Sequence, residues 1–160
     1  PTKDELPIYH CHGFLPRNRS SYSGLDKSTL VFSEEGYHAI FADPFHWSNL
    51  VQLGQLRESI CLMVGLSMTD PNIRRLLEIA ARRNDSVRHF ALMRRISKDE
   101  FLRMSEPPSE KSRDSIDEFL AIHHSIKEAV LLELGVSIIW VEEYAQIPAI
   151  LARIQKPLNV

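Results

Sequence analysis

The clearest hydrophobic pattern lies at residues 60–72, where an unbroken apolar run from Ile60 to Val64 stops at Gly65. Such a run predicts a strand that is buried on both faces, as in a parallel sheet covered by helices. Asp70 and Pro71 then give a helix start signal, because a carboxylate can accept first-turn N–H groups and proline has none to satisfy. Apolar residues follow at helical spacing: Ile73, Leu76, Leu77, Ala80 and Ala81. The stretch therefore predicts a strand–loop–helix unit.

The rest of the chain continues this alternation of short apolar runs and amphipathic segments. Four further strands are expected, at Pro7–His12, Thr29–Phe32, Val87–Met93 and Val136–Val141. Helices are expected at 34–41, from the Asp43-Pro44 signal to about Arg57, and from the Ser97/Glu100 capping box to Met104. Two more are expected, one from the Ser115/Glu118 capping box to Leu134 and a closing helix with Pro148 in its first turn. Strands that alternate with helices predict an α/β, Rossmann-like three-layer fold with a mostly parallel sheet.

Composition changes this picture little. The chain has 160 residues, 44% hydrophobic and 25% charged, which suits one globular domain. A net charge of -2 gives no electrostatic signal for nucleic acid or for a membrane surface. No run has transmembrane length and the start shows no secretory signal pattern, so a cytoplasmic protein is expected. Cys11 and Cys61 are too few for a disulfide framework or a four-cysteine zinc site, and are expected to be reduced, buried thiols.

Two places carry candidate chemistry. Ligands of open α/β sheets bind at the carboxyl ends of strands, where Gly65 admits a close backbone approach and Ser67 offers a hydroxyl; a plain strand-to-helix turn explains the same residues. His12, at the end of a predicted strand, suits either a general base or a structural histidine, and lacks a spaced partner set for a metal. His123 and His124 are expected on a helix surface. Neither G-x-G-x-x-G nor a P-loop motif occurs in the 160 residues.

The order of three short motifs carries a family resemblance. They are His12-Gly13, the segment Leu30-Val31-Phe32-Ser33 followed by Glu34-Glu35-Gly36-Tyr37, and the turn from Val64 to Ile73. Together they resemble the sirtuin-like family, most closely its zinc-free bacterial branch, and the strand Ile138–Val141 fits as well. The resemblance implies that residues 1–160 form a single sirtuin-like domain, the C-terminal half to two-thirds of a complete one. The N-terminal Gly-rich βα unit of the family is missing from these residues.

By this resemblance His12 is the catalytic histidine, a base on a ribose hydroxyl or on water, while Gly13, Gly65 and Ser67 contact NAD. Leu66 departs from the hydroxyl residue of protein deacylases, and Asp70 is read as a helix cap. NAD is implied as substrate, with NAD or ADP-ribose as small-molecule partner and no metal. We also expect a homo-oligomer.

Three functions follow as hypotheses. The first is an NAD hydrolase (NAD glycohydrolase) that releases nicotinamide and ADP-ribose once its domain is complete, of the kind that serves as an antiphage-defence effector. The second is an NAD-dependent protein deacylase, which the absence of any Cys-x-x-Cys makes less favoured. The third is a non-catalytic module for nucleotide binding or oligomerisation.

Overall fold

The computed structural model describes residues 7–24, 30–82, 88–104 and 110–154, which fall into two compact units. The first unit is Pro1–Gly54 and the second is Gln55–Val160. Each unit is described separately below.

The first unit is helical where it is regular. It holds a short 3-10 helix η1 (Arg19–Ser21), α1 (Glu34–Ala42) and the start of α2 (Trp47–Glu58), which continues into the second unit. Ser33 caps α1, since its Oγ accepts the Gly36 N–H at 3.1 Å.

The turn between α1 and α2 corrects one expectation. Asp43 does not start a helix: it ends α1, and its carboxylate accepts the Phe45 N–H at 2.9 Å. The buried amide of Asn49 closes this turn by donating to the carbonyls of Ile40 and Asp43, both at 2.8 Å. Because these carbonyls are left over at a helix end, a side-chain donor at this place stabilises the turn.

The prediction of two strands before α1 is wrong. Residues 7–12 form no strand and end in a turn at 11–12, and residues 30–32 are irregular, while Thr29 lies outside the described residues. One backbone bond joins the two segments, from the Val31 N–H to the His12 carbonyl at 3.0 Å. A strand needs a ladder of such bonds and an apolar face to bury, yet Ile8 and Phe32 stay exposed.

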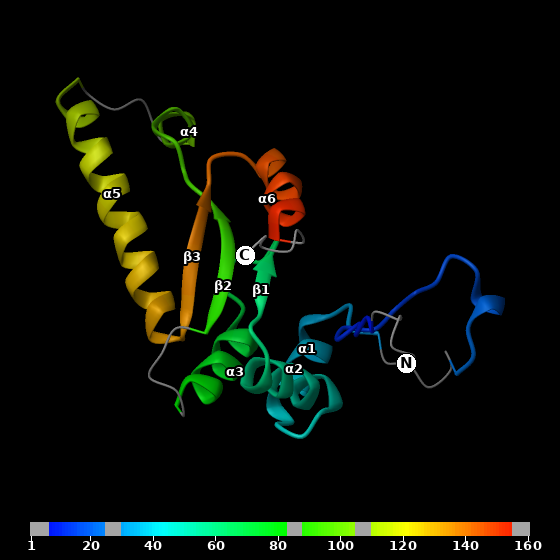
Figure 1. Cartoon of the computed structure of the whole chain (residues 1–160). Helices are drawn as coiled ribbons and strands as arrows, with labels where there is room; N and C mark the ends of the chain where they lie inside the picture. The colour runs from blue at the N-terminus through cyan, green and yellow to red at the C-terminus, as the bar shows by residue number, and fades with distance from the viewer. Residues whose placement is uncertain (1–6, 25–29, 83–87, 105–109, 155–160) are drawn as a thin grey trace, which may run out of the picture. The chain divides into compact units, whose positions relative to one another are not determined.

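The second unit is built on a parallel three-stranded sheet in the order β1 (Leu62–Val64), β2 (His89–Arg94) and β3 (Val136–Val141). Met63 pairs with Ala91, and Leu92 with Ile139. Helix α3 (Pro71–Ala81) connects β1 to β2. Figure 1 shows the three arrowheads pointing to the same end. This is the α/β, Rossmann-like arrangement that the alternating pattern predicts, although the first and third strands are less buried than expected.

Burial of β1 is a correction to the sequence reading. Only Met63 is buried, whereas Leu62 and Val64 are 37% and 41% exposed. Side chains alternate between the two faces of a sheet, so Leu62 and Val64 share the face opposite to Met63, and the described residues cover that face less completely. In β3, only the end residues Val136 and Val141 are fully buried.

The remaining helices are α4 (Lys98–Met104), α5 (Glu110–Glu133), the 3-10 helix η3 (Tyr144–Gln146) and α6 (Ile147–Ile154). Helix α5 runs alongside β3 (Figure 1) and begins at Glu110, so Ser115 lies inside it and is no cap, contrary to expectation. Gly135 ends α5 as predicted: its φ is 73° and its N–H donates to the Leu132 carbonyl at 2.9 Å.

Two histidines of the second unit are buried, and one of them was expected at the surface. His124 is 7% exposed, its Nε2 accepts the Ile96 N–H at 3.3 Å, and its ring meets Trp140 edge-on at 4.8 Å. His89 is 3% exposed, and its Nδ1 accepts the Cys61 N–H at 3.2 Å. Burial lowers the pKa of both imidazoles, and the charges of Arg88 near His89 and Arg95 near His124 lower it further.

Because of these two histidines, we expect the free energy of unfolding to fall on mild acidification. In the unfolded chain they take up protons near pH ~6.5, whereas in the folded protein their lowered pKa values leave them less protonated at that pH. The unfolded state thus binds more protons, and the free energy of unfolding should fall as pH drops from about 7.5 to about 5.5. Urea denaturation across this range measures the slope. His89→Gln combined with His124→Gln should flatten it, and a stability that stays level or rises in the unmodified protein would contradict the assignment.

Both cysteines of the chain lie within the described residues. Cys11, in a turn, and Cys61, just before β1, are free thiols of intermediate burial rather than buried strand residues, and burial raises the pKa of both. Within residues 7–24, 30–82, 88–104 and 110–154, no helix is both long and apolar enough to cross a membrane.

Candidate functional site

The loop from Gly65 to Asp70 joins the carboxyl end of β1 to α3, and local signals shape both of its ends. Gly65 adopts a φ of 74°, the left-handed conformation that glycine enters without steric cost. At the other end Asp70 caps α3, since its Oδ1 accepts the Ile73 N–H at 2.9 Å, and Pro71 occupies the first turn. The predicted cap is confirmed.

The middle of the loop is held by side chains. Met68 has a φ of 61° and is 2% exposed, so a non-glycine residue is held in a disfavoured conformation by burial of its side chain. Its carbonyl accepts a hydrogen bond from Arg74 Nη1 at 3.3 Å. Ser67 Oγ lies 2.7 Å from Thr69 Oγ1 and accepts the Thr69 N–H at 3.3 Å. Strained backbone of this kind, fixed by its surroundings, is frequent at ligand-binding loops.

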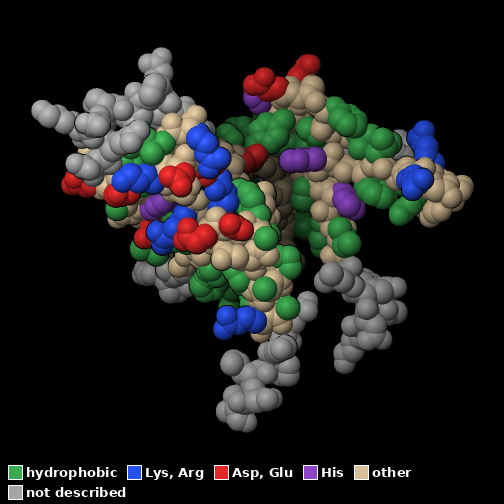
Figure 2. Space-filling model, turned by 90° about the horizontal axis from the view of Figure 1, so that it is seen from above, with side chains coloured by type: hydrophobic (Ala, Val, Ile, Leu, Met, Phe, Trp, Pro, Cys, Tyr) green, Lys and Arg blue, Asp and Glu red, His purple; other side chains and the backbone are tan. Residues whose placement is uncertain are grey.

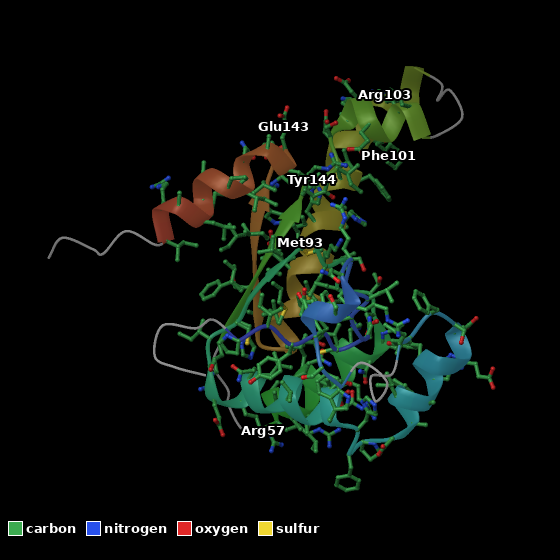
Figure 3. All side chains as sticks on the ribbon, turned by 90° about the vertical axis from the view of Figure 1, so that its right-hand side faces the viewer. Arg57, Met93, Phe101, Arg103, Glu143 and Tyr144 are labelled. Carbon is green, nitrogen blue, oxygen red and sulfur yellow. The ribbon has the colours of Figure 1, made fainter. Side chains whose placement is uncertain are left out.

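A pocket of about 470 Å³ opens beside this loop, at the carboxyl ends of β1 and β2. We call it the strand-end pocket. Its lining comes from the loop, β2, α5 and η3: Gly65, Leu66, Ser67, Thr69, Leu92, Met93, Arg94, Lys127 and Tyr144. Figure 3 shows Met93 and Tyr144 at this end of the sheet. The volume is within the range of small-molecule sites, and the ammonium group of Lys127 suits an anionic ligand. Arg94, the second cation of the lining, is paired with Glu100.

Arg94 is the last residue of β2 and the most strongly held side chain of the pocket. Its Nη1 and Nη2 donate to the two carboxylate oxygens of Glu100 at 2.6 and 2.5 Å, and Nη1 also donates to the Arg95 carbonyl at 3.3 Å. Its guanidinium carbon lies 5.4 Å from the centre of the Tyr144 ring. The bond to Glu100, followed by one to Tyr144, raises the pKa of Arg94, and Arg94 lowers the pKa of Glu100.

Of the four site residues predicted from the sequence, His12 and Gly13 belong to the first unit, and Gly65 and Ser67 belong to the second. The imidazole of His12 is exposed and meets the Tyr37 ring edge-on at 6.2 Å. Gly13 has a φ of 90° and donates its N–H to the His10 carbonyl at 2.9 Å, which closes the turn that presents His12. An exposed imidazole on a tight turn can reach a ligand and exchange a proton with it.

Substituting Gly65 tests how far the loop depends on its backbone. Gly65→Ala should lower the free energy of unfolding by about 1–2 kcal/mol, because an L-residue is strained at this φ. An added Cβ would meet no atom within 4 Å, so the cost is conformational and not steric. Gly54→Ala, inside α2 and equally open, is the matched control and should stabilise by about 0.5–1 kcal/mol. Equal effects of the two changes would contradict the prediction.

Among the residues that the structure describes, no group of three or more His, Cys, Asp or Glu side chains is arranged to hold a metal ion.

Sequence reasoning missed three residues that line the pocket: Arg94, Lys127 and Tyr144. A signal existed for Arg94, because it directly follows the predicted strand 87–93 and the carboxyl ends of parallel strands share one edge. It also missed the ion-pair partner of Glu100, because the sequence pattern assigns Glu100 to a capping box with Ser97. Ser97 does accept the Glu100 N–H at 3.2 Å, but the Glu100 carboxylate pairs with Arg94.

A family model described as a SIR2-like domain matches residues 1–119, which include the first unit, the loop from Gly65 to Asp70 and β2. A search of the curated proteins gave no match.

Proposed function

The chain belongs to the SIR2-like family, which is associated with NAD, and from this premise we propose that it is an NAD hydrolase that releases nicotinamide and ADP-ribose. The observation that carries the proposal is the strand-end pocket, where Gly65, Ser67 and two cations meet at the carboxyl ends of two parallel strands. In this role Gly65 and Ser67, with Gly13, contact the dinucleotide, and His12 is the catalytic residue.

The strand-end pocket supports the nucleotide part of the proposal. Gly65 has no side chain to keep a ligand from its backbone, the Ser67 hydroxyl can donate or accept, and Lys127 brings positive charge toward a diphosphate. The pocket lies at the same edge of the sheet as dinucleotide sites in other parallel α/β proteins. A phosphate-binding Gly-rich loop is not present in the 160 residues, so we propose that residues beyond them complete the site.

Hydrolysis of NAD requires from the protein a base and an electrostatic environment that tolerates positive charge on the ribose. The bond between C1′ of the ribose and the nicotinamide nitrogen breaks, and nicotinamide leaves with the bonding electrons, which neutralises its ring. Water adds to C1′ and gives up a proton. Positive charge develops on the ribose, so a base such as His12, acting on a ribose hydroxyl or on the water, favours the reaction. No metal is needed in this scheme.

The resemblance to the zinc-free bacterial branch supports depletion of NAD as the outcome, and with it a role of the antiphage-defence kind. The two cysteines of the chain, Cys11 and Cys61, cannot form the four-cysteine module that accompanies acyl-peptide binding in the deacylating branch. Hydrolysis is therefore preferred over protein deacylation.

The test is nicotinamide release from NAD, measured with and without an acylated peptide. It should be run on the 160-residue chain and on a version that carries residues upstream of Pro1. Release that does not depend on the peptide supports the hydrolase. Release only with the peptide would replace it by the deacylase, and ADP-ribose binding without any release would replace it by a nucleotide-binding module.

A further inference from the structure

A short loop, residues 95–97, connects the end of β2 to α4, and we call it the β2–α4 loop. It directly follows Arg94, which lines the strand-end pocket. Its backbone is tied to the end of β3, because the Arg95 N–H donates to the Val141 carbonyl at 2.9 Å. The Arg95 carbonyl in turn accepts from Arg94 Nη1 at 3.3 Å. The place of the Arg94 side chain in the pocket therefore depends on where this loop lies.

The charged side chains around the β2–α4 loop are paired with one another. The pairs are Arg94–Glu100, Arg95–Glu142 and Lys98–Asp117, with N–O distances of 2.5, 3.6 and 2.6 Å. Figure 2, which views the arrowhead end of the sheet, shows basic and acidic side chains intermixed. Because each of these cations has an anion beside it, the three pairs carry no net charge. The loop is held by specific contacts and not by an excess of one charge.

One of these contacts comes from a buried histidine of α5. The Ile96 N–H, in the middle of the loop, donates to His124 Nε2 at 3.3 Å. The imidazole is 7% exposed, and the Trp140 ring of β3 meets it edge-on at 4.8 Å. A ring nitrogen that accepts a hydrogen bond carries no proton, so this contact requires neutral His124 with its proton on Nδ1. His124 thereby joins α5, β3 and the β2–α4 loop.

Protonation of His124 is incompatible with this contact. The added proton would go to Nε2, and two N–H donors would then face each other at a buried position. Since a buried donor without an acceptor is costly, the loop must move away from the imidazolium. Arg95, His123 and Lys127 oppose a positive charge on the ring, and Glu128 favours it. Burial, followed by the charge of Arg95, lowers the pKa of His124, so the neutral, bonded form prevails at neutral pH.

We propose that His124 is a positioning residue of the strand-end pocket: in its neutral form it fixes the β2–α4 loop and with it Arg94, and on protonation it releases both. His124 is not part of the lining of that pocket, so it acts through the loop. Affinity for a ligand in the pocket then falls as the pH drops through the pKa of His124, and it is fully present above. The effect on ligand binding rests on the proposed function, whereas the release of the loop does not.

The first measurement is hydrogen exchange of the Ile96 amide by NMR between pH 7.5 and pH 5.0, while circular dichroism shows that the protein stays folded. The rate is divided by that of an unstructured peptide at the same pH, which gives the protection factor. In the unmodified protein this factor should fall about tenfold or more with pH, because the amide loses its buried acceptor.

Three variants separate the role of His124 from a general effect of acid. His124→Gln offers a carbonyl oxygen near the place of Nε2 and cannot titrate, so the Ile96 amide should stay protected at every pH. His124→Leu has no acceptor, so protection should be low throughout. His89→Gln is the matched control, since His89 is 3% exposed and accepts the Cys61 N–H in the same way. It should leave the pH profile of Ile96 unchanged.

The second measurement is calorimetric titration with ADP-ribose over the same pH series. The unmodified protein should bind about fivefold more weakly at pH 5.0 than at pH 7.5, the size of an ordinary coupling between two sites. His124→Gln should bind with the same affinity at both ends of the series. His89→Gln should behave as the unmodified protein does.

The outcomes are distinguishable. Constant protection of Ile96 across the series overturns the inference, and so does a profile that His124→Gln leaves intact or that His89→Gln abolishes. The profile of the unmodified protein counts even if His124→Leu does not fold. An ADP-ribose affinity that stays level while the Ile96 amide is released shows that the loop does not position the pocket, which also overturns it. If ADP-ribose binds at no pH, the proposed function fails, and the exchange data still decide the role of His124.

Discussion

Replacing His12 by alanine is expected to lower nicotinamide release by about 10²–10⁴-fold, the usual contribution of a positioned acid or base. The imidazole is exposed on a tight turn, and its one ring contact within the described residues is the edge-on approach to Tyr37 at 6.2 Å. Few packing contacts depend on it. The free energy of unfolding should therefore change by no more than about 0.5 kcal/mol, and ADP-ribose should still bind.

His10 provides the matched control for this experiment. It is exposed, lies two residues away in the same segment, and stacks on Phe14 at 4.5 Å. His10→Ala removes the same chemical group and should leave the rate within about threefold of the unmodified protein, as a surface change does. Full activity in His12→Ala, or an equal loss in both variants, would show that His12 is not the base. The rates are read from nicotinamide released under saturating NAD, with stability checked by urea denaturation.

The parts of the fold that sequence could predict are those fixed by near neighbours. The Asp70 cap and the left-handed Gly135 each depend on residues within four positions along the chain, so the printed sequence contains the whole signal. The strand–loop–helix unit around Gly65 follows from the same kind of local evidence. The α/β class then results from the alternation of such units.

The failures come from partners far apart in the chain. Residues 7–12 have a strand pattern, but a strand exists only with a neighbour to pair with. Within the described residues, one backbone bond joins this segment to residues 30–32. His124 is buried because Trp140 of β3 packs on it, which no helical periodicity predicts. Ser115 and Glu118 match a capping box, yet α5 already starts at Glu110.

The candidate site divides in the same way. Gly65 and Ser67 were recognisable because they follow a strand and precede a helix cap. The cations of the pocket were not, since Arg94 and Lys127 come from β2 and α5 and meet the loop only after folding. The partner of the Glu100 carboxylate also depends on tertiary structure. The backbone N–H of Glu100 donates to Ser97 Oγ, while its carboxylate accepts from Arg94. The loop residues of the site can therefore be predicted from the sequence, whereas the side chains that reach the loop from other elements cannot.

The free energy of unfolding, and with it the order of the Gly65–Asp70 loop, should depend strongly on Leu77, the most buried side chain of α3. Leu77 is 0% exposed, and Leu76 and Ala80 on the same helix are 2% and 8% exposed. Leu77→Ala removes apolar contacts and leaves a cavity that a packed helix cannot close, so it should lower the free energy of unfolding by about 2–5 kcal/mol.

Leu132→Ala is the control, because Leu132 is 53% exposed on α5 and the same atoms are removed. Its cost should stay near 0.5 kcal/mol, as at other surface positions. Urea denaturation followed by circular dichroism gives both values. Similar costs would mean that α3 does not form the core of the second unit. A large difference would show that the Gly65–Asp70 loop depends on the packing of α3. Because we expect ADP-ribose to bind the folded protein at this loop, it should restore part of the free energy of unfolding that Leu77→Ala removes.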